Sequence, residues 1–156
     1  QEFVGKLLKN APLFASGGRD ATTTFMQRKI GDVLVSFESE AELIAKEFGK
    51  GEFEVVYPSL SILTEFPVAI VEKTVDKKGT RKQAQAYLEY LWSKDGQEIA
   101  AQNYLRPRDA EILKKYAAQF PAIKTFSVDE VFGGWTKAFP AHFKDGGSFD
   151  RIYQSK

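Results

Sequence analysis

The chain has 156 residues, of which 43% are hydrophobic and 28% are charged, a composition that is typical of globular proteins and excludes wholesale disorder. Its 22 basic and 21 acidic residues give a formal net charge of +1, and no basic cluster of the kind that binds nucleic acid is present. No run of 18 apolar residues occurs, so no membrane-spanning helix is expected, and the absence of cysteine excludes a disulfide framework and thiol chemistry. Because the chain begins at Gln1, without Met or a signal peptide, we expect that processing or truncation removed its start.

The first two predicted elements are helices. Residues 1–9 place four apolar side chains on one helical face, which predicts that the chain starts inside a helix. A glycine-bearing turn at 16–18 then leads into a second helix, which we expect Gly31 to close. Such a turn leaves backbone N–H groups at a helix N-terminus, where the helix dipole favours an oxyanion. The alternative is an ordinary turn, with Gly18 chosen for a positive φ.

An alternation of helices and strands is predicted next. The apolar run 32–38 is typical of a buried strand, and a capping box of Ser39 and Glu42 starts a helix after it. Residues 52–57 alternate as a second strand, which Pro58 ends. This order indicates an α/β layer with parallel strands, whose ligands bind at the carboxyl ends of the strands, where Gly18 and Phe37 are both expected.

The second half is predicted to be mostly helical. Residues 59–65 form a connection and 66–71 a new strand, and this connection is either a hinge crossover or an ordinary loop. The helical spacing then predicts four helices, at 80–92, 97–103, 109–120 and 131–143. Capping boxes are expected before the first of these helices, from Thr80 and Gln83, and before the last, from Ser127 and Glu130. In the last helix we also expect a break at Gly133-Gly134 and a kink at Pro140.

Enzymatic chemistry finds little support in the residues. His142 is the only histidine, no Gly-x-Ser-x-Gly motif occurs, and we interpret His142 as a surface or capping residue. The carboxylates Glu38, Glu40 and Glu42 surround the start of a predicted helix, where acidic side chains favour the dipole. They are therefore not interpreted as a metal site or a glycosidase pair. We expect a protein that is not an enzyme, with no catalytic residue, no cofactor and no metal.

Several motifs resemble one known family, the periplasmic sulfate-binding proteins of ABC importers. The resemblance lies in residues 18–25 (GRDATTTF) with 30–34 (IGDVL), and in three later segments, 95–101 (DGQEIAA), 104–110 (YLRPRDA) and 129–135 (DEVFGGW). It covers essentially the whole chain, and because family chains are about twice as long, it implies the C-terminal half of such a protein.

The resemblance implies an α/β fold that is a portion of a two-lobed, type II periplasmic binding protein, with a parallel or mixed sheet flanked by helices. Residues 1–58 are then part of one lobe, 59–66 a hinge crossover, and 67–156 part of the other lobe, with C-terminal helices packing back across both. It also implies a periplasmic location and, as partners, sulfate or a related oxyanion and a membrane permease, but no nucleic acid. A binding or sensing module for molybdate or phosphate on the same fold stays open as an alternative.

Three anion-binding positions follow from the resemblance. Gly18 takes the position whose backbone N–H binds sulfate, and Arg19 takes the basic position that supports the loop; the alternative for Arg19 is a surface ion pair with Asp20. Phe37 stands where the family has a tryptophan whose indole N–H donates to sulfate, and phenylalanine has no donor. Because half a cleft leaves apolar surface uncovered, we also expect self-association of this chain.

Overall fold

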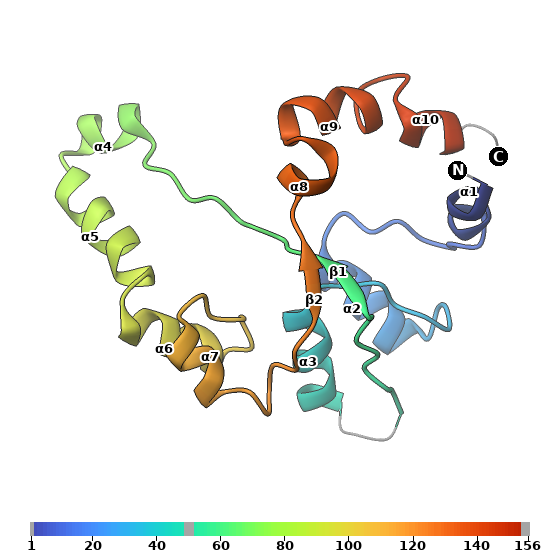
Figure 1. The fold of residues 1–156 in the computed structure, drawn as a ribbon, viewed down its shortest axis with the longest axis horizontal. Helices are drawn as coiled ribbons and strands as arrows, with labels where there is room; N and C mark the ends of the chain where they lie inside the picture. The colour runs from blue at the N-terminus through green and yellow to red at the C-terminus, as the bar shows by residue number, and fades with distance from the viewer. Residues whose placement is uncertain (1, 49–51, 154–156) are drawn as a thin grey trace. The chain divides into compact units, whose positions relative to one another are not determined.

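The computed structural model describes residues 2–48 and 52–153, and the chain divides into two compact units. We call residues 1–63 with 123–156 the first unit and residues 64–122 the second unit. Figure 1 shows their helices and strands. Among the described residues, no helix is long and apolar enough to cross a membrane.

The first unit is built around two short parallel strands. Its elements in chain order are α1 (Glu2–Lys9), α2 (Gly18–Arg28), α3 (Glu38–Phe48), β1 (Leu60–Ile62), β2 (Lys124–Phe126), α8 (Val128–Phe132), α9 (Trp135–His142) and α10 (Ser148–Tyr153). Strand β1 pairs with β2 in parallel, with Ile62 opposite Phe126, and the Leu63 N–H donates to the Phe126 carbonyl at 2.8 Å. This pairing joins the two stretches of chain that make up the unit.

Helices α2 and α3 pack against each other and share a small buried core. Thr22, Met26 and Ile44 are buried there, because the apolar and small residues of α2 fall on the side that faces α3. Helix α2 ends at Arg28, and its C-cap residue Lys29 has a left-handed φ of 54°. The predicted closure at Gly31 was therefore two residues late, although Gly31 also has a positive φ, of 91°.

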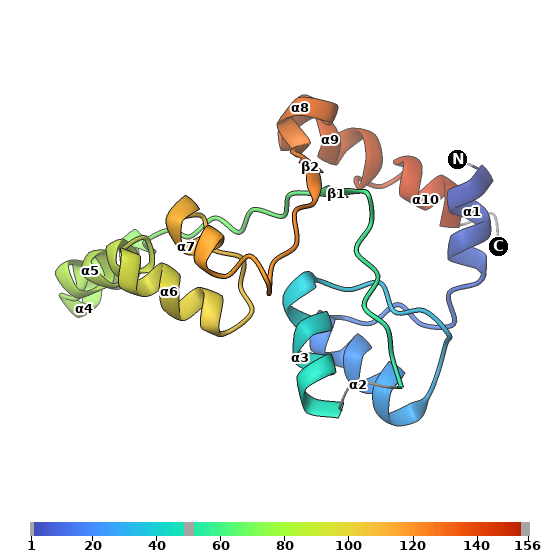
Figure 2. The same cartoon turned by 60° about the horizontal axis from the view of Figure 1, so that its bottom comes forward.

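The C-terminal helices of the first unit follow the predicted capping signals. Ser127 and Glu130 form the expected capping box at the start of α8. The break also lies where expected, since Gly133 and Gly134 have φ values of 69° and 88° and separate α8 from α9, and Pro140 lies inside α9. Helix α10 was not predicted, and it lies beside α1 in both views (Figures 1 and 2).

The second unit is a chain of four helices, α4 (Glu72–Lys78), α5 (Arg81–Leu91), α6 (Lys94–Gln102) and α7 (Ala110–Lys115). Its core consists of Ala101, Ile112 and Phe120. Buried Gln97 links the helices, because its amide nitrogen donates to the Leu91 carbonyl at 2.8 Å and its oxygen accepts from the Arg108 N–H at 2.6 Å. A polar side chain is tolerated in this position because its hydrogen bonds are satisfied.

Several other helix starts, ends and caps differ from the prediction. Helix α3 begins at Glu38, so Ser39 lies inside the helix and does not cap it. Thr80 is the N-cap of α5, but its side chain makes no capping hydrogen bond. Helix α6 begins earlier than expected because Ser93 caps it by accepting from the Gly96 N–H, and α7 ends at Lys115 rather than at residue 120. Helix α4 was not predicted.

The strand predictions were wrong. Residues 32–38, 52–57 and 66–71 are not strands, whereas β1 lies in the stretch predicted as a connection and β2 was not predicted. A strand is defined by the neighbour whose backbone it pairs with, and among the described residues these three segments have none. The sequence pattern therefore identified segments that suit a sheet, but not whether the chain supplies their partners.

Candidate functional site

The start of α2 presents free backbone donors. Gly17 precedes the helix in an extended conformation, with φ −164° and ψ 164°, and no side chain caps this end. The first intrahelical bond runs from the Ala21 N–H to the Gly17 carbonyl at 3.1 Å. Within the part of the chain that the structure describes, the N–H groups of Gly18, Arg19 and Asp20 have no hydrogen-bond partner. Three such donors at the positive end of an 11-residue helix can bind an anion.

Phe37 lies against this helix start. A Cβ atom on Gly18 would be 3.6 Å from Cδ2 of Phe37 and 3.6 Å from Cγ of Glu40. The structure therefore brings two of the three predicted site residues together, although they are far apart in sequence. The Phe37 side chain is 47% exposed, so it borders the donors on one side without closing them off from water.

Arg19 is held by carboxylates of α3. Its Nε lies 3.5 Å from Oε2 of Glu40, and its guanidinium donates to Oε2 of Glu47 at 3.3 Å. The alternative of a surface ion pair is therefore confirmed for Arg19, but its partners are Glu40 and Glu47 and not the expected Asp20. Glu40 and Glu47 are seven residues apart, which places both on one face of α3. Arg19 accordingly fastens the start of α2 to α3, and its predicted role is in supporting the loop rather than in touching the anion.

Glu40 is the residue of this region that the sequence analysis did not assign to the site. Its Oε2 also accepts a hydrogen bond from the hydroxyl of buried Thr22 at 3.2 Å, so it links the two helices twice. Its carboxylate and that of Asp20 place negative charge near the free donors, and Arg19 offsets part of it. An i, i+7 acidic pair opposite a helix-start arginine is the signal that could have identified it.

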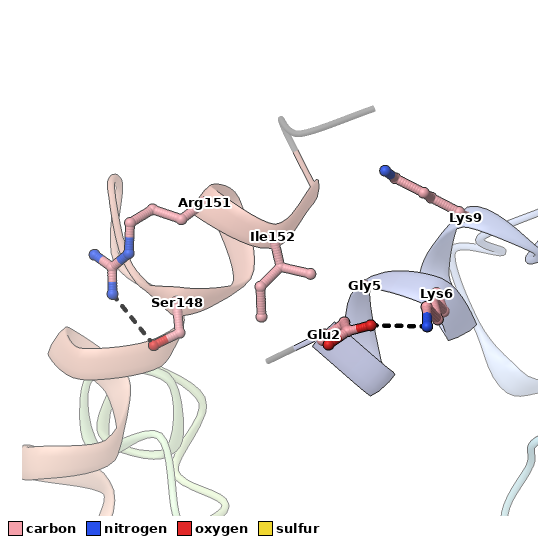
Figure 3. A pocket seen from close by; sticks show the side chains of 7 residues that line it. All are labelled: Glu2, Gly5, Lys6, Lys9, Ser148, Arg151 and Ile152. Carbon is pink, nitrogen blue, oxygen red and sulfur yellow. Dashed lines mark hydrogen bonds and ion pairs between the residues drawn. The ribbon is translucent and has the colours of Figure 1, made fainter.

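A cavity of about 420 Å³ between α1 and α10 is a different feature (Figure 3). It is lined by Glu2, Gly5, Lys6, Lys9, Ser148, Arg151 and Ile152. Its cations do not converge, because Lys6 pairs with Glu2 at 2.8 Å while the Arg151 side chain bends back to Ser148 on its own helix (Figure 3). This arrangement indicates no anion site.

Within the described ranges, no cluster of side chains indicates a metal site or a catalytic site. No set of three His, Asp or Glu side chains there could hold a metal ion. The Nδ1 atom of His142 lies 3.3 Å from Oγ of Ser148, and its ring contacts Phe132 edge-on, which is the environment of a structural histidine. The free donors of α2 thus remain the candidate site.

Comparison with known proteins gives consistent matches along the chain. Over 98% of its length it is 63% identical to the thiosulfate-binding protein of Pseudomonas aeruginosa, and over 97% it is 57% identical to the sulfate-binding protein of Escherichia coli. It is also 44% identical to the thiosulfate-binding protein of Escherichia coli over 97% of its length. The chain spans about half the length of these curated relatives, 46%, 46% and 45% respectively.

The family itself is shown by a match that covers most of the chain. Residues 1–106 match the family described as bacterial extracellular solute-binding protein. This match and the relatives confirm the resemblance stated from the sequence motifs, together with the α/β fold class that it implied. The chain belongs to the bacterial extracellular solute-binding protein family.

Proposed function

We propose that this chain is a C-terminal portion of the solute-binding component of a sulfate or thiosulfate ABC importer and contributes one wall of its oxyanion site. The observation that carries the proposal is the 57–63% identity to proteins named for sulfate and thiosulfate binding, over nearly the whole chain. The free donors at the start of α2 support the proposal, because an oxyanion could accept hydrogen bonds from them. The protein acts by binding, not by catalysis.

The proposed chemistry needs only hydrogen-bond donors. Sulfate is a dianion whose oxygens only accept, so the N–H groups of Gly18, Arg19 and Asp20 match it, and the helix dipole adds to their attraction. Phosphate carries a proton at neutral pH that needs an acceptor. A site of donors alone leaves that proton unpaired, at a cost of about 1–3 kcal/mol, and so favours sulfate over phosphate.

The site is open to water on this chain alone. The bordering Phe37 ring supplies no donor and is half exposed, so each hydrogen bond to the anion competes with solvent. We therefore expect weak binding by the isolated chain and tighter binding when a second wall closes over the anion. Residues 59–66 are the proposed hinge between the lobes that form such walls. A periplasmic location and a membrane permease as partner complete the proposal.

Gly18 allows a test that removes one donor and little else. Gly18 is the first helical residue, the position where proline is tolerated best, and extended Gly17 before it has the conformation that precedes proline. Gly18→Pro thus deletes the proposed N–H donor while α2 can still form. Gly18→Ala is the matched control, because it keeps the N–H and its Cβ meets Phe37 and Glu40 at ordinary contact distances of 3.6 Å.

Calorimetric titration with sulfate at fixed ionic strength provides the measurement. We expect Gly18→Ala to bind like the unmodified chain and Gly18→Pro to bind about tenfold more weakly, equivalent to about 1.4 kcal/mol. Equal binding by all three proteins would contradict the proposal. Tighter binding of molybdate or phosphate than of sulfate would instead favour a sensing module for another oxyanion.

A further inference from the structure

The candidate anion site has an apolar border beside its first donor. Apart from the adjoining backbone, the three heavy atoms nearest to the place of a Cβ on Gly18 are all carbons. They are Cδ2 and Cε2 of Phe37, at 3.6 and 3.8 Å, and Cγ of Glu40, at 3.6 Å. The charged end of Glu40 is engaged elsewhere, because its Oε2 accepts from the Thr22 hydroxyl and pairs with Arg19. An anion that reaches the start of α2 therefore meets backbone donors on one side and the rim of an aromatic ring on another.

Thiosulfate matches this combination of donors and ring better than sulfate does. Both are tetrahedral dianions, but one of the oxygens of sulfate is replaced by a terminal sulfur in thiosulfate. The oxygens that remain can accept from the N–H groups of Gly18, Arg19 and Asp20. The sulfur is larger and softer than an oxygen, accepts hydrogen bonds weakly, and makes favourable contacts with the edge of an aromatic ring. It therefore suits the part of the site that has no donor.

We propose, building on the proposed function, that Phe37 is a specificity-determining residue that makes this site prefer thiosulfate to sulfate. The ring contacts the terminal sulfur while the start of α2 binds the oxygens. Cδ2 and Cε2 are bonded neighbours on the rim of the ring, and the rim carries the positive part of the ring quadrupole, which attracts a polarizable anionic sulfur. A sulfate oxygen in the same place meets carbon and loses a hydrogen bond that water gave it, so sulfate is bound more weakly.

The exposure of the ring sets the size of this preference. Phe37 is 47% exposed, so an anion reaches the ring without displacing a buried side chain, although water still competes for the anion. A contact between sulfur and an aromatic ring is equivalent to roughly twofold to tenfold in affinity. Together with the hydrogen bond that sulfate loses, we expect thiosulfate to bind the chain about fivefold more tightly than sulfate.

Titrations with thiosulfate, sulfate and selenate at fixed ionic strength, followed through the backbone amide resonances of Gly18, Arg19 and Asp20, test the preference. Selenate is the control for size, because it is larger than sulfate but has oxygens only, and it should bind like sulfate. Phe37→Trp offers an N–H in place of a ring C–H and should bring the affinities for thiosulfate and sulfate together. Phe143→Leu is the matched control, since Phe143 is 55% exposed at the end of α9, and it should keep the fivefold preference.

The ring protons of Phe37 in the unmodified chain give a second reading that needs no substitution. Thiosulfate should shift their resonances strongly at saturation, and sulfate should shift them clearly less. Equal affinities for the two anions, selenate binding as tight as that of thiosulfate, or an unchanged preference in Phe37→Trp would refute the role of Phe37 and leave the proposed function standing. Binding of neither anion would overturn the proposed function and the role of Phe37 together.

Discussion

Replacing Phe37 with tryptophan tests whether the ring position beside α2 faces the bound anion. The Phe37 ring lies against Gly18, with Cδ2 3.6 Å and Cε2 3.8 Å from the place of a Cβ atom on that residue. An indole in this position carries an N–H at its edge, close to the three free backbone donors. Because the side chain is 47% exposed, the larger ring has room without displacing buried atoms. Phe37→Trp should therefore add a fourth donor to the site.

The size of the expected gain in sulfate affinity follows from the exposure of the site. A hydrogen bond to a charged group contributes about 1.5–3 kcal/mol when it is protected from water, and a half-exposed position lowers this to about 1 kcal/mol, or roughly fivefold in affinity. Phe37→Leu is the matched control, because it is apolar and has no donor. Calorimetric titration with sulfate should rank Phe37→Trp about fivefold tighter than both the unmodified chain and Phe37→Leu. If Phe37→Trp binds no better than Phe37→Leu, the ring does not face the anion and the reasoning fails.

Two further predictions concern the framework of the first unit. Thr22→Val removes the hydroxyl that donates to Glu40 and should lower the free energy of unfolding, measured in thermal or urea melts, by about 1.5 kcal/mol. Thr24→Val is the control, because the Thr24 hydroxyl makes no hydrogen bond to the described residues, and its loss of stability should be clearly smaller. Equal losses in the two variants would contradict this prediction. Hydrogen bonds from the Ser127 backbone and side chain lower the pKa of Glu130, so its contribution to stability is present at neutral pH and is lost as the pH falls below its usual value of 4.5. Glu130→Gln should remove that part of the acid dependence of unfolding, and an unchanged acid limb would refute the assignment.

The sequence predicted helices better than strands because their signals are local. The capping box of Ser127 and Glu130 and the glycine break after it depend on residues within a few positions of each other, and both are found in the structure. Ser39 misled the prediction, because a serine followed three residues later by an acid also occurs inside a first turn. The strand at 32–38 failed for a different reason, since it depends on a neighbour that the described part of the chain does not supply.

The sequence predicted which residues lie at the candidate site better than it predicted the contacts that these residues make. The glycine-bearing turn correctly located a helix start with free donors, and the resemblance placed Phe37 beside it, as the structure has it. The pairing of Arg19 with Glu40 and Glu47 could not be predicted, because it depends on how α2 and α3 pack. The anion-binding role of these residues stays a prediction.

The most direct test of that role is to follow the backbone amide resonances of the chain by NMR while sulfate is added. Sodium chloride at equal ionic strength serves as the reference titration. We predict saturable shifts for the amides of Gly18, Arg19 and Asp20 with sulfate alone. The Gly96 amide at the start of α6 should show no such shift, because it already donates a hydrogen bond to Oγ of Ser93. Shifts that are the same with both salts, or that occur only elsewhere in the chain, would contradict an oxyanion site at α2.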